Sequence, residues 1–167
     1  MLPFETSVED PNVLSEEIPF KNQVLEEHVE LEDMYDPNRG QYKGRGYLEV
    51  CSKRGEKLDD IVIGLTDHDL FTGHLNFIFG LAEKDGKGCI ISTHRLGDGE
   101  KMKERMIKEA VHEIGHVVGL EHCSNRRCVM HFSNSLLDTD KKSKWYCRSC
   151  EKRFESLLKK RRIFLDY

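Results

Sequence analysis

The sequence predicts a compact α+β domain, and three observations support this fold class. Three short apolar runs typical of β-strands lie between residues 61 and 92, an amphipathic pattern typical of one long helix covers about 99–119, and the chain beyond residue 120 is irregular. With 167 residues, of which 38% are hydrophobic, the chain is long enough for one core and too short for a second. We therefore expect residues 1–167 to form a single domain.

Composition and charge exclude several classes of protein. No stretch approaches the roughly 18 apolar residues of a membrane helix, and the acidic start of the chain differs from the basic and apolar start of a signal peptide. We therefore expect a cytoplasmic protein. The net charge of −4 is too small to indicate nucleic-acid binding, although residues 1–36 carry eleven acidic residues and one lysine, whereas residues 141–167 carry ten basic and three acidic residues.

The N-terminal part of the chain gives weak signals for regular structure. A loose alternation of apolar and acidic residues predicts a strand at 24–31, and Asp-Pro-Asn-Arg-Gly at 36–40 predicts a turn. A helix is expected next, because apolar residues recur at helical spacing despite two glycines, each of which disfavours a helix interior by roughly 1 kcal/mol. The apolar residues are Tyr42, Tyr47, Leu48 and Cys51, and the glycines are Gly44 and Gly46.

Three strands and two helices are expected further along the chain. The strands are 61–65, 75–79 and 89–92, which are rich in β-branched and aromatic residues. The long helix at about 99–119 carries an apolar stripe, and Gly119 suits the left-handed residue that ends a helix. A short closing helix is expected from about residue 151, before a basic tail at 159–162. The stripe consists of Met102, Met106, Ala110, Ile114 and Val117.

The end of the long helix carries a metal-binding pattern. His112 and His116 are one turn apart on one face, the spacing that two adjacent zinc ligands need, and Glu113 lies beside them. Gly119 turns the chain so that His122 returns as a third ligand. The full run is H-E-x-x-H-x-x-G-x-x-H, which resembles the metzincin signature of zinc peptidases. Five fixed positions at the correct spacing argue against a chance match.

This ligand set indicates a catalytic metal ion. Three neutral imidazoles leave the fourth tetrahedral position of zinc to water, as in catalytic zinc sites. Zinc lowers the pKa of that water to roughly 7 and polarises a substrate carbonyl, while Glu113 acts as general base towards the water and as general acid towards the leaving amine. The sequence therefore predicts peptide-bond hydrolysis through a zinc-bound water.

The six cysteines fall into two groups by spacing. In a chain with no export signal, cysteines favour metal binding or burial over disulfides. Cys51 and Cys89 are solitary and are expected in the core, on a helix and a strand respectively. The other four form a C-x4-C pair and a C-x2-C pair within 28 residues, and they are Cys123, Cys128, Cys147 and Cys150.

Together with these cysteines, the histidine motif resembles the archaemetzincins. That family has the pattern H-E-x-x-H-x-x-G-x-x-H-C-x4-C-x-M followed by a C-x2-C pair, and weaker matches extend the resemblance over about residues 39–150. The resemblance implies a metzincin-like catalytic domain with a mixed, twisted sheet packed on helices. It also implies an N-terminal subdomain at about 1–119 and a smaller, zinc-bound C-terminal subdomain at about 120–167.

The resemblance further implies roles for individual residues. It assigns a second, structural zinc ion to Cys123, Cys128, Cys147 and Cys150. It places Met130 in a Met-turn beneath the catalytic zinc, as a packing floor and not as a ligand. It makes the strand around 74–79 the edge of the sheet, to which an extended peptide adds. We therefore expect two zinc ions per chain and a peptide or protein substrate bound by a monomer.

Other residues receive plainer interpretations. The basic tail at 159–162 is expected to solubilise the end of the chain and not to contact nucleic acid, because no aromatic residues interleave with it. His131 follows Met130 and is a candidate for the active-site cleft. The remaining polar candidates are expected to be surface, hydrogen-bonded or turn residues, and they are Asp67, His68, Asp69, His74 and His94.

A zinc-stabilised binding module is the alternative function. In that interpretation the four cysteines form a ribbon-like zinc knuckle, the basic tail contacts a partner, and the histidine site is vestigial or regulatory. Glu113 argues against it, because a structural metal site has no use for a carboxylate beside an open coordination position. The sequence leaves endopeptidase and aminopeptidase action both open.

Overall fold

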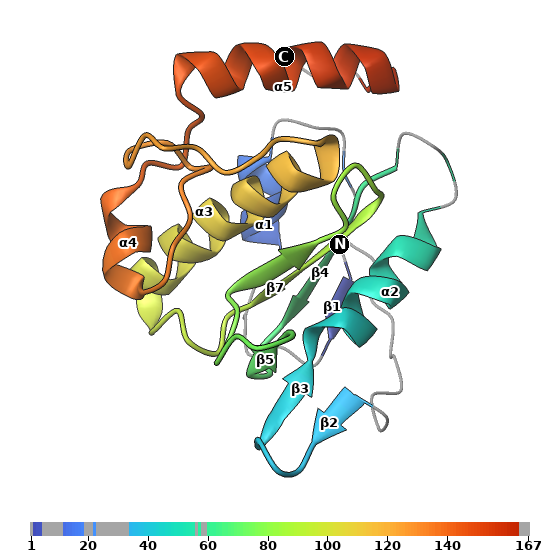
Figure 1. Cartoon of the computed structure of the whole chain (residues 1–167), viewed down its shortest axis with the longest axis vertical. Helices are drawn as coiled ribbons and strands as arrows, with labels where there is room; N and C mark the ends of the chain where they lie inside the picture. The colour runs from blue at the N-terminus through green and yellow to red at the C-terminus, as the bar shows by residue number, and fades with distance from the viewer. Residues whose placement is uncertain are drawn as a thin grey trace.

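The computed structural model describes residues 2–4, 12–18, 22, 34–55, 57 and 60–163. The strand expected at 24–31 lies outside the described residues. Figure 1 shows the elements, which in chain order are β1 (Leu2–Phe4), α1 (Asn12–Glu17), β2 (Tyr35–Asp36), β3 (Gln41–Lys43), α2 (Gly44–Arg54), β4 (Val62–Thr66), β5 (Leu70–Phe71), β6 (Gly80–Ala82), β7 (Gly88–Ser92), α3 (Gly99–Val118), α4 (Leu136–Lys141) and α5 (Arg148–Arg161).

A mixed four-stranded sheet lies at the centre of the fold, with the strand order β1-β4-β7-β6. The first three strands are parallel to one another, and β6 runs antiparallel to β7. A smaller described sheet has the order β2-β3-β5, in which β2 and β3 flank the turn expected at 36–40. The predicted α+β class and the mixed sheet are therefore confirmed.

Side chains of the central strands alternate between two cores. Cys89 and Ile91 of β7 belong to the apolar cluster that includes α3, whereas Ile90 between them belongs to the cluster with Tyr47 and Cys51 of α2. Because successive residues of a strand point to opposite faces of a sheet, each face needs its own covering helix. Figure 1 shows α2 and α3 on opposite sides of β4 and β7. The expected core positions of Cys51 and Cys89 are confirmed, since both are fully buried.

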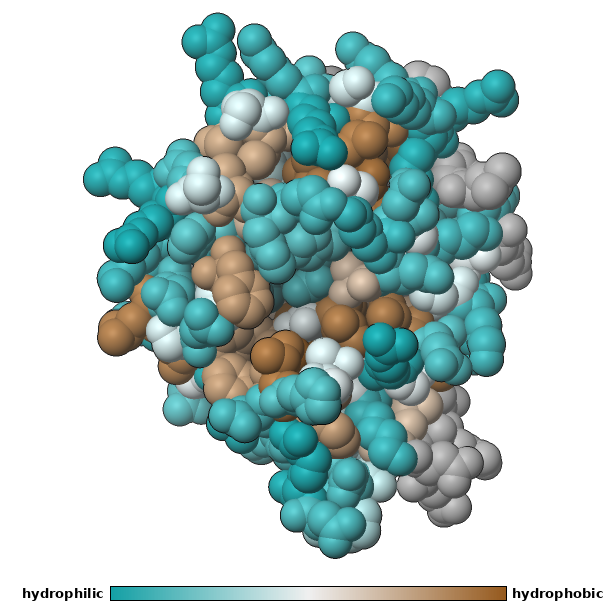
Figure 2. All heavy atoms as spheres, in the orientation of Figure 1, coloured by the Kyte–Doolittle hydropathy of each residue, from teal (hydrophilic) through white to brown (hydrophobic). Residues whose placement is uncertain are grey.

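The long helix α3 joins the sheet to the C-terminal part of the chain. Its expected apolar stripe packs on β7 and β6, and Phe154 and Leu158 of α5 lie in the same buried cluster. Figure 2 shows that the side chains extending outward from α5 are mainly hydrophilic, as its many basic and acidic residues require. Among the described residues, no helix combines the length and the apolar character needed to cross a membrane.

The strand predicted at 75–79 is wrong. Within it only Ile78 makes a bridge, to Leu70, and the regular strand is β6, which begins at Gly80. The physical reason lies in the side chains around the segment: Arg39 donates to the carbonyls of Leu75 and Asn76, so these acceptors are bound by a guanidinium and not by a neighbouring strand. The apolar and polar alternation there reflects a loop fixed by side chains.

Other boundaries differ in smaller ways. The helix expected around 42–51 begins only at Gly44, and Tyr42 belongs to β3. The closing helix begins at Arg148, earlier than expected, so Cys150 lies in its first turn. Short elements that were not predicted complete the fold, and they are α1, α4, β1, β2, β3 and β5.

Candidate metal centre

The C-terminal end of α3 brings three histidines together. His112, Glu113 and His116 lie in the last two turns, and Gly119 ends the helix with a left-handed φ of 109°. Its backbone N–H donates to the carbonyls of Gly115 and His116, and the N–H of Leu120 donates to Gly115, which closes the turn. The chain thereby reverses, and the ring of His122 lies with its centroid 4.7 Å from that of His116.

The backbone fixes which ring nitrogens of His112 and His116 face the centre. His112 Nδ1 lies 2.7 Å from the carbonyl oxygen of Val129, and His116 Nδ1 lies 2.8 Å from that of Leu120. A carbonyl oxygen only accepts hydrogen bonds, so each Nδ1 carries the proton and each Nε2 exposes a lone pair. The two Nε2 atoms are 3.1 Å apart. Two lone pairs this close repel each other, so the geometry fits a cation bound by both nitrogens.

Burial favours the neutral form of all three histidines. Burial lowers the pKa of His112 well below the usual range, and burial also lowers the pKa values of His116 and His122. One nitrogen from each ring lies within 4.8 Å of the others. Neutral imidazoles that converge in this way fit the three-histidine donor set of a catalytic zinc ion.

Glu113 lies beside this cluster in a buried position. Its side chain belongs to the face of α3 turned towards β6, because a Cβ atom at Gly80 would lie 2.6 Å from Glu113 Oε1. Burial is the main cause, and the nearby Glu109 a smaller one, that together raise the pKa of Glu113 to about 8 against the opposing effect of Lys142. A carboxyl group with a pKa near neutrality is able both to accept and to donate a proton at neutral pH.

Met130 lies beneath α3, in the turn formed by residues 129–131. Its Sδ atom occupies the space next to Gly115 that a Cβ would fill, so only glycine allows the helix to approach this closely. The preceding residue, Val129, supplies the carbonyl that orients His112. Met130 itself is fully buried.

The four clustered cysteines form a second ligand set. Their sulfur atoms all lie within 4.8 Å of one another, and Cys123 Sγ and Cys147 Sγ are 3.8 Å apart. Four thiolates about 2.3 Å from a zinc ion have tetrahedral edges of roughly 3.8 Å, so the arrangement fits structural zinc and is too open for a disulfide. Hydrogen bonds from Ser149 and from the backbone N–H of Cys150 lower the pKa of the Cys147 thiol to about 6.

Comparison with known proteins decides the family. The sequence profile of peptidase family M54 matches residues 23–156. The archaemetzincin of Pyrococcus furiosus is 47% identical over 133 residues, which are 74% of this chain and 69% of that protein. The chain belongs to the archaemetzincin family. The archaemetzincin of Methanopyrus kandleri is 45% identical over 132 residues, which are 77% of this chain and 74% of that protein.

Solved archaemetzincin structures share the whole fold. The structure from Methanopyrus kandleri superposes with a TM-score of 0.80 at 35% identity and covers 95% of this chain and 94% of that one. The structure from Archaeoglobus fulgidus, complexed with malonate, superposes with a TM-score of 0.78 at 35% identity and covers 91% of this chain and 96% of that one. As a member of this family the chain is a zinc metallopeptidase that acts on peptide substrates, and the binding-module alternative is not favoured.

Other candidate histidines and aspartates of the chain have structural partners, whereas His74 is exposed. His68 accepts or donates a hydrogen bond with the hydroxyl of Tyr47, and His94 Nδ1 bonds the carbonyl of Asp67. His131 Nδ1 lies 2.9 Å from the carbonyl oxygen of Cys123, one of the four clustered cysteines. Asp69 is more than a turn residue, because it forms a bidentate ion pair with Arg95.

Sequence reasoning missed two residues next to the histidine centre. Gly80 lies in one of the weaker family matches and was given no role, yet its lack of a side chain leaves room for Glu113. Lys142 lies in a charged stretch and has the pattern of a surface residue, yet its side chain is fully buried beside Glu109. Neither residue has a signal in the local sequence, because Gly80 contacts Glu113 and Lys142 contacts Glu109, and each contact joins residues 33 positions apart.

Proposed function

We propose that His112, His116 and His122 hold the catalytic zinc ion and that Glu113 is the general base and general acid of peptide hydrolysis. The observation that carries this proposal is the pair of Nε2 atoms 3.1 Å apart, each on a ring whose Nδ1 is bonded to a backbone carbonyl. A zinc ion held by these three histidines would lower the pKa of a coordinated water to about 7 and would polarise the scissile carbonyl.

Glu113 then has two tasks. Its carboxylate accepts the proton of the attacking water and delivers that proton to the nitrogen of the leaving amine. Because Glu113 is buried, bulk water does not compete for its carboxylate. Its raised pKa suits both accepting a proton from the water and donating one to the amine. Gly80 leaves the space in which the carboxylate lies.

The second ligand set is proposed to be structural. Cys123, Cys128, Cys147 and Cys150 would hold a zinc ion in a closed four-cysteine site, which gives two zinc ions per chain. Met130 would support the catalytic site by packing and Gly119 by turning the chain. In domain terms, we propose one catalytic domain over residues 1–167, with an N-terminal subdomain to about 119 and a C-terminal subdomain from about 120.

The peptide-binding edge was expected at 74–79, but the strand at this edge of the central sheet is β6, and an extended substrate is proposed to bind along β6. In the ladder with β7, the carbonyl of Phe79 accepts from Ser92 and the N–H of Glu83 donates to Gly88. Backbone groups of an antiparallel strand alternate in direction, so those of Gly80 and Ala82 point away from β7. A peptide paired there would lie beside Glu113.

The proposal extends to partners and location. Both ligand sets come from one chain, which supports a monomer. The thiols of a zinc site persist in a reducing compartment, which supports the cytoplasm. Arg161 of the basic tail donates to the carbonyls of Val117 and Gly86, which supports an internal role for that residue and not a nucleic-acid contact.

Cleavage mapping of a mixed peptide library by mass spectrometry tests the function. Zinc-loaded protein is compared with the Glu113→Ala variant, and zinc content is measured for both. We expect cuts that disappear in the variant while two zinc ions per chain remain. The positions of the cuts distinguish removal of terminal residues from internal cleavage. Equal cleavage by the two proteins, or no cleavage by a wild type holding both zinc ions, would contradict the proposal.

A further inference from the structure

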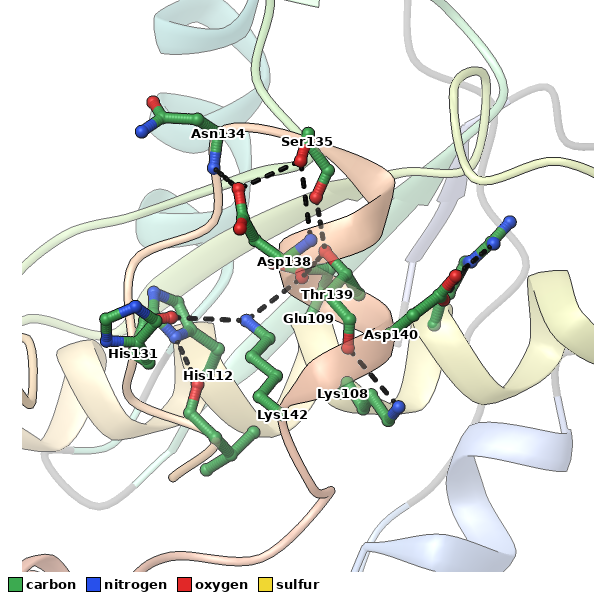
Figure 3. Close-up of polar contacts among 12 residues, drawn as sticks. Lys108, Glu109, His112, His131, Asn134, Ser135, Asp138, Thr139, Asp140 and Lys142 are labelled. Carbon is green, nitrogen blue, oxygen red and sulfur yellow. Dashed lines mark hydrogen bonds and ion pairs between the residues drawn. The ribbon is translucent and has the colours of Figure 1, made fainter. Parts of the chain in front are cut away.

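A buried ion pair lies beside the histidine centre and has no part in the proposed chemistry. Lys142 Nζ is 3.1 Å from Glu109 Oε1, and the two side chains are 0% and 4% exposed. Figure 3 shows the pair between α3 and the end of α4, close to His112 and His131. Desolvating two charges offsets most of their attraction, so such a pair is weak as a source of stability and is better explained by what it positions.

Both members have a second contact that fixes them. Lys142 Nζ lies 3.5 Å from the carbonyl oxygen of His131, to which it donates a long hydrogen bond. Glu109 Oε1 also accepts from the hydroxyl of Thr139 in α4 at 3.2 Å. The ammonium group of Lys142 therefore connects Glu109, three residues before His112 in α3, to the turn at residues 129–131.

All three backbone carbonyls of residues 129–131 accept a hydrogen bond. The donors are a histidine of α3, the backbone after the third histidine, and Lys142. Val129 accepts from His112 Nδ1 at 2.7 Å, and Met130 accepts from the N–H of Cys123, the residue after His122, at 2.9 Å. His131 accepts from Lys142. The position of the turn thus sets the orientation of the His112 ring and the position of Met130 against Gly115. Lys142 adds a further link, from His131 to Glu109 of α3.

We propose that Lys142 and Glu109 are positioning residues of the catalytic metal centre, holding residues 129–131 against α3 so that His112 presents Nε2 to the metal. This inference rests on the proposed function. Partners that orient a metal ligand through its second ring nitrogen change metal affinity or activity about 10- to 100-fold when removed. Lys142 and Glu109 position His112 through residues 129–131. An effect of the same size on metal affinity is therefore expected only if this turn moves when the ion pair is lost.

Lys108 provides a matched control. It is also a buried lysine between the same two helices, with a side chain 4% exposed, but it donates to the carbonyl of Thr139 and pairs with Glu104. The same substitution, lysine to methionine, therefore removes a comparable buried charge without a contact to residues 129–131. Any effect that comes only from weaker packing of α4 on α3 appears in both variants.

The test compares Lys142→Met, the double variant Glu109→Gln with Lys142→Met, and Lys108→Met. The double variant leaves no unpaired buried charge, and neutral replacement of a whole buried pair is often harmless to stability, so it keeps the test valid if Lys142→Met fails to fold. Three readouts are made on folded protein: zinc affinity by chelator competition, the visible spectrum of the cobalt-substituted histidine site, and kcat and KM separately.

We expect the double variant to bind zinc at the histidine site about tenfold or more weakly, with a shifted cobalt spectrum and a lower kcat at unchanged KM. Lys108→Met should keep zinc affinity within about threefold of wild type. Wild-type zinc affinity and spectrum in the double variant, or equal losses in Lys108→Met, would overturn the inference. A wild type that binds no metal at the histidines would instead overturn the proposed function, so the two failures are distinguishable.

Discussion

Gly80 and the carboxylate of Glu113 are in direct contact across the gap between β6 and α3. A Cβ atom at position 80 would lie 2.6 Å from Oε1, 2.7 Å from Cγ and 2.9 Å from Cδ of Glu113. Real Cβ atoms do not approach other atoms this closely, so any side chain at this point of β6 would displace Glu113. The contact ties the position of the proposed base to the position of the sheet edge.

Gly80→Ala is therefore expected to displace Glu113 and to lower kcat by about tenfold or more, since a shift of about 1 Å at a catalytic group costs up to about 100-fold. Zinc content should be unchanged. Gly46→Ala is the control, because the added methyl would meet only the flexible side chain of Met34, away from the centre. Steady-state kinetics with a cleaved peptide measure both variants, and equal kcat values would contradict the prediction.

Ala82→Pro tests substrate binding along β6. The backbone N–H of Ala82 points away from β7, so proline removes a donor to the substrate without breaking the ladder. We expect kcat/KM to fall about tenfold while the melting temperature stays within a few degrees of wild type. Leu81→Pro, which removes a group bonded to β7, should instead destabilise the protein. Unchanged peptide cleavage by Ala82→Pro would show that substrates bind elsewhere.

Metal removal is expected to loosen the C-terminal part of the chain. Structural zinc contributes directly to folding free energy, so complete chelation should lower the melting temperature by about 10 °C or more and speed amide hydrogen exchange in residues 123–150. His122→Ala, which keeps all four cysteines, should show the same chelator effect, because it depends on the cysteine site. Identical melting curves with and without both metals would refute this.

Asp69 gives a pH-dependent contribution to stability. Burial alone would raise its pKa, but the hydrogen bonds from Arg95 and Gln41 outweigh burial and lower it. A carboxyl group with a lowered folded-state pKa stabilises fully above its unfolded value of about 3.9, and this contribution is lost as the pH falls through the folded value. Asp69→Asn should thus cost on the order of 1–2 kcal/mol at pH 7, limited by the 43% exposure of Arg95.

The loss should shrink below about pH 4, where the wild-type carboxyl also becomes protonated. Urea unfolding of both proteins at pH 7, 5 and 3 gives the difference in unfolding free energy, in which the metal contribution common to both proteins cancels. A difference that is the same at all three pH values would show that Asp69 acts only through its shape.

Arg161 is expected to stabilise the fold more than its neighbour Arg162. Its guanidinium donates to Val117 at the end of α3, at 2.6 Å, and to Gly86 in the turn between β6 and β7, at 2.5 Å. Hydrogen bonds to charged groups contribute about 1.5–3 kcal/mol, so Arg161→Met should destabilise by about that amount. Arg162→Met, at an exposed position, should stay within about 0.5 kcal/mol. Equal unfolding free energies for the two variants would contradict this.

Local sequence patterns were sufficient to predict a long helix, whose backbone hydrogen bonds are internal, and a strand whose residues form one apolar run. The apolar stripe and Gly119 predicted α3 to within one residue at its C-terminal end, and β7 was predicted to within one residue. The segment 75–79 failed because its alternation has the period of a strand while its carbonyls are bound by Arg39, which is 36 residues away from Leu75. Such a contact leaves no trace in a window of a few residues.

The candidate site divides in the same way. The sequence by itself determined the ligand types, because histidine spacing on a helix and a glycine that ends it fix which side chains share a face. Only the tertiary structure decided what surrounds them: Gly80 against Glu113, Val129 on His112, and Lys142 buried under the turn that carries Met130. The physical reason is that ligand spacing is set by 3.6 residues per turn, whereas burial and orientation are set by segments that meet only when the chain folds.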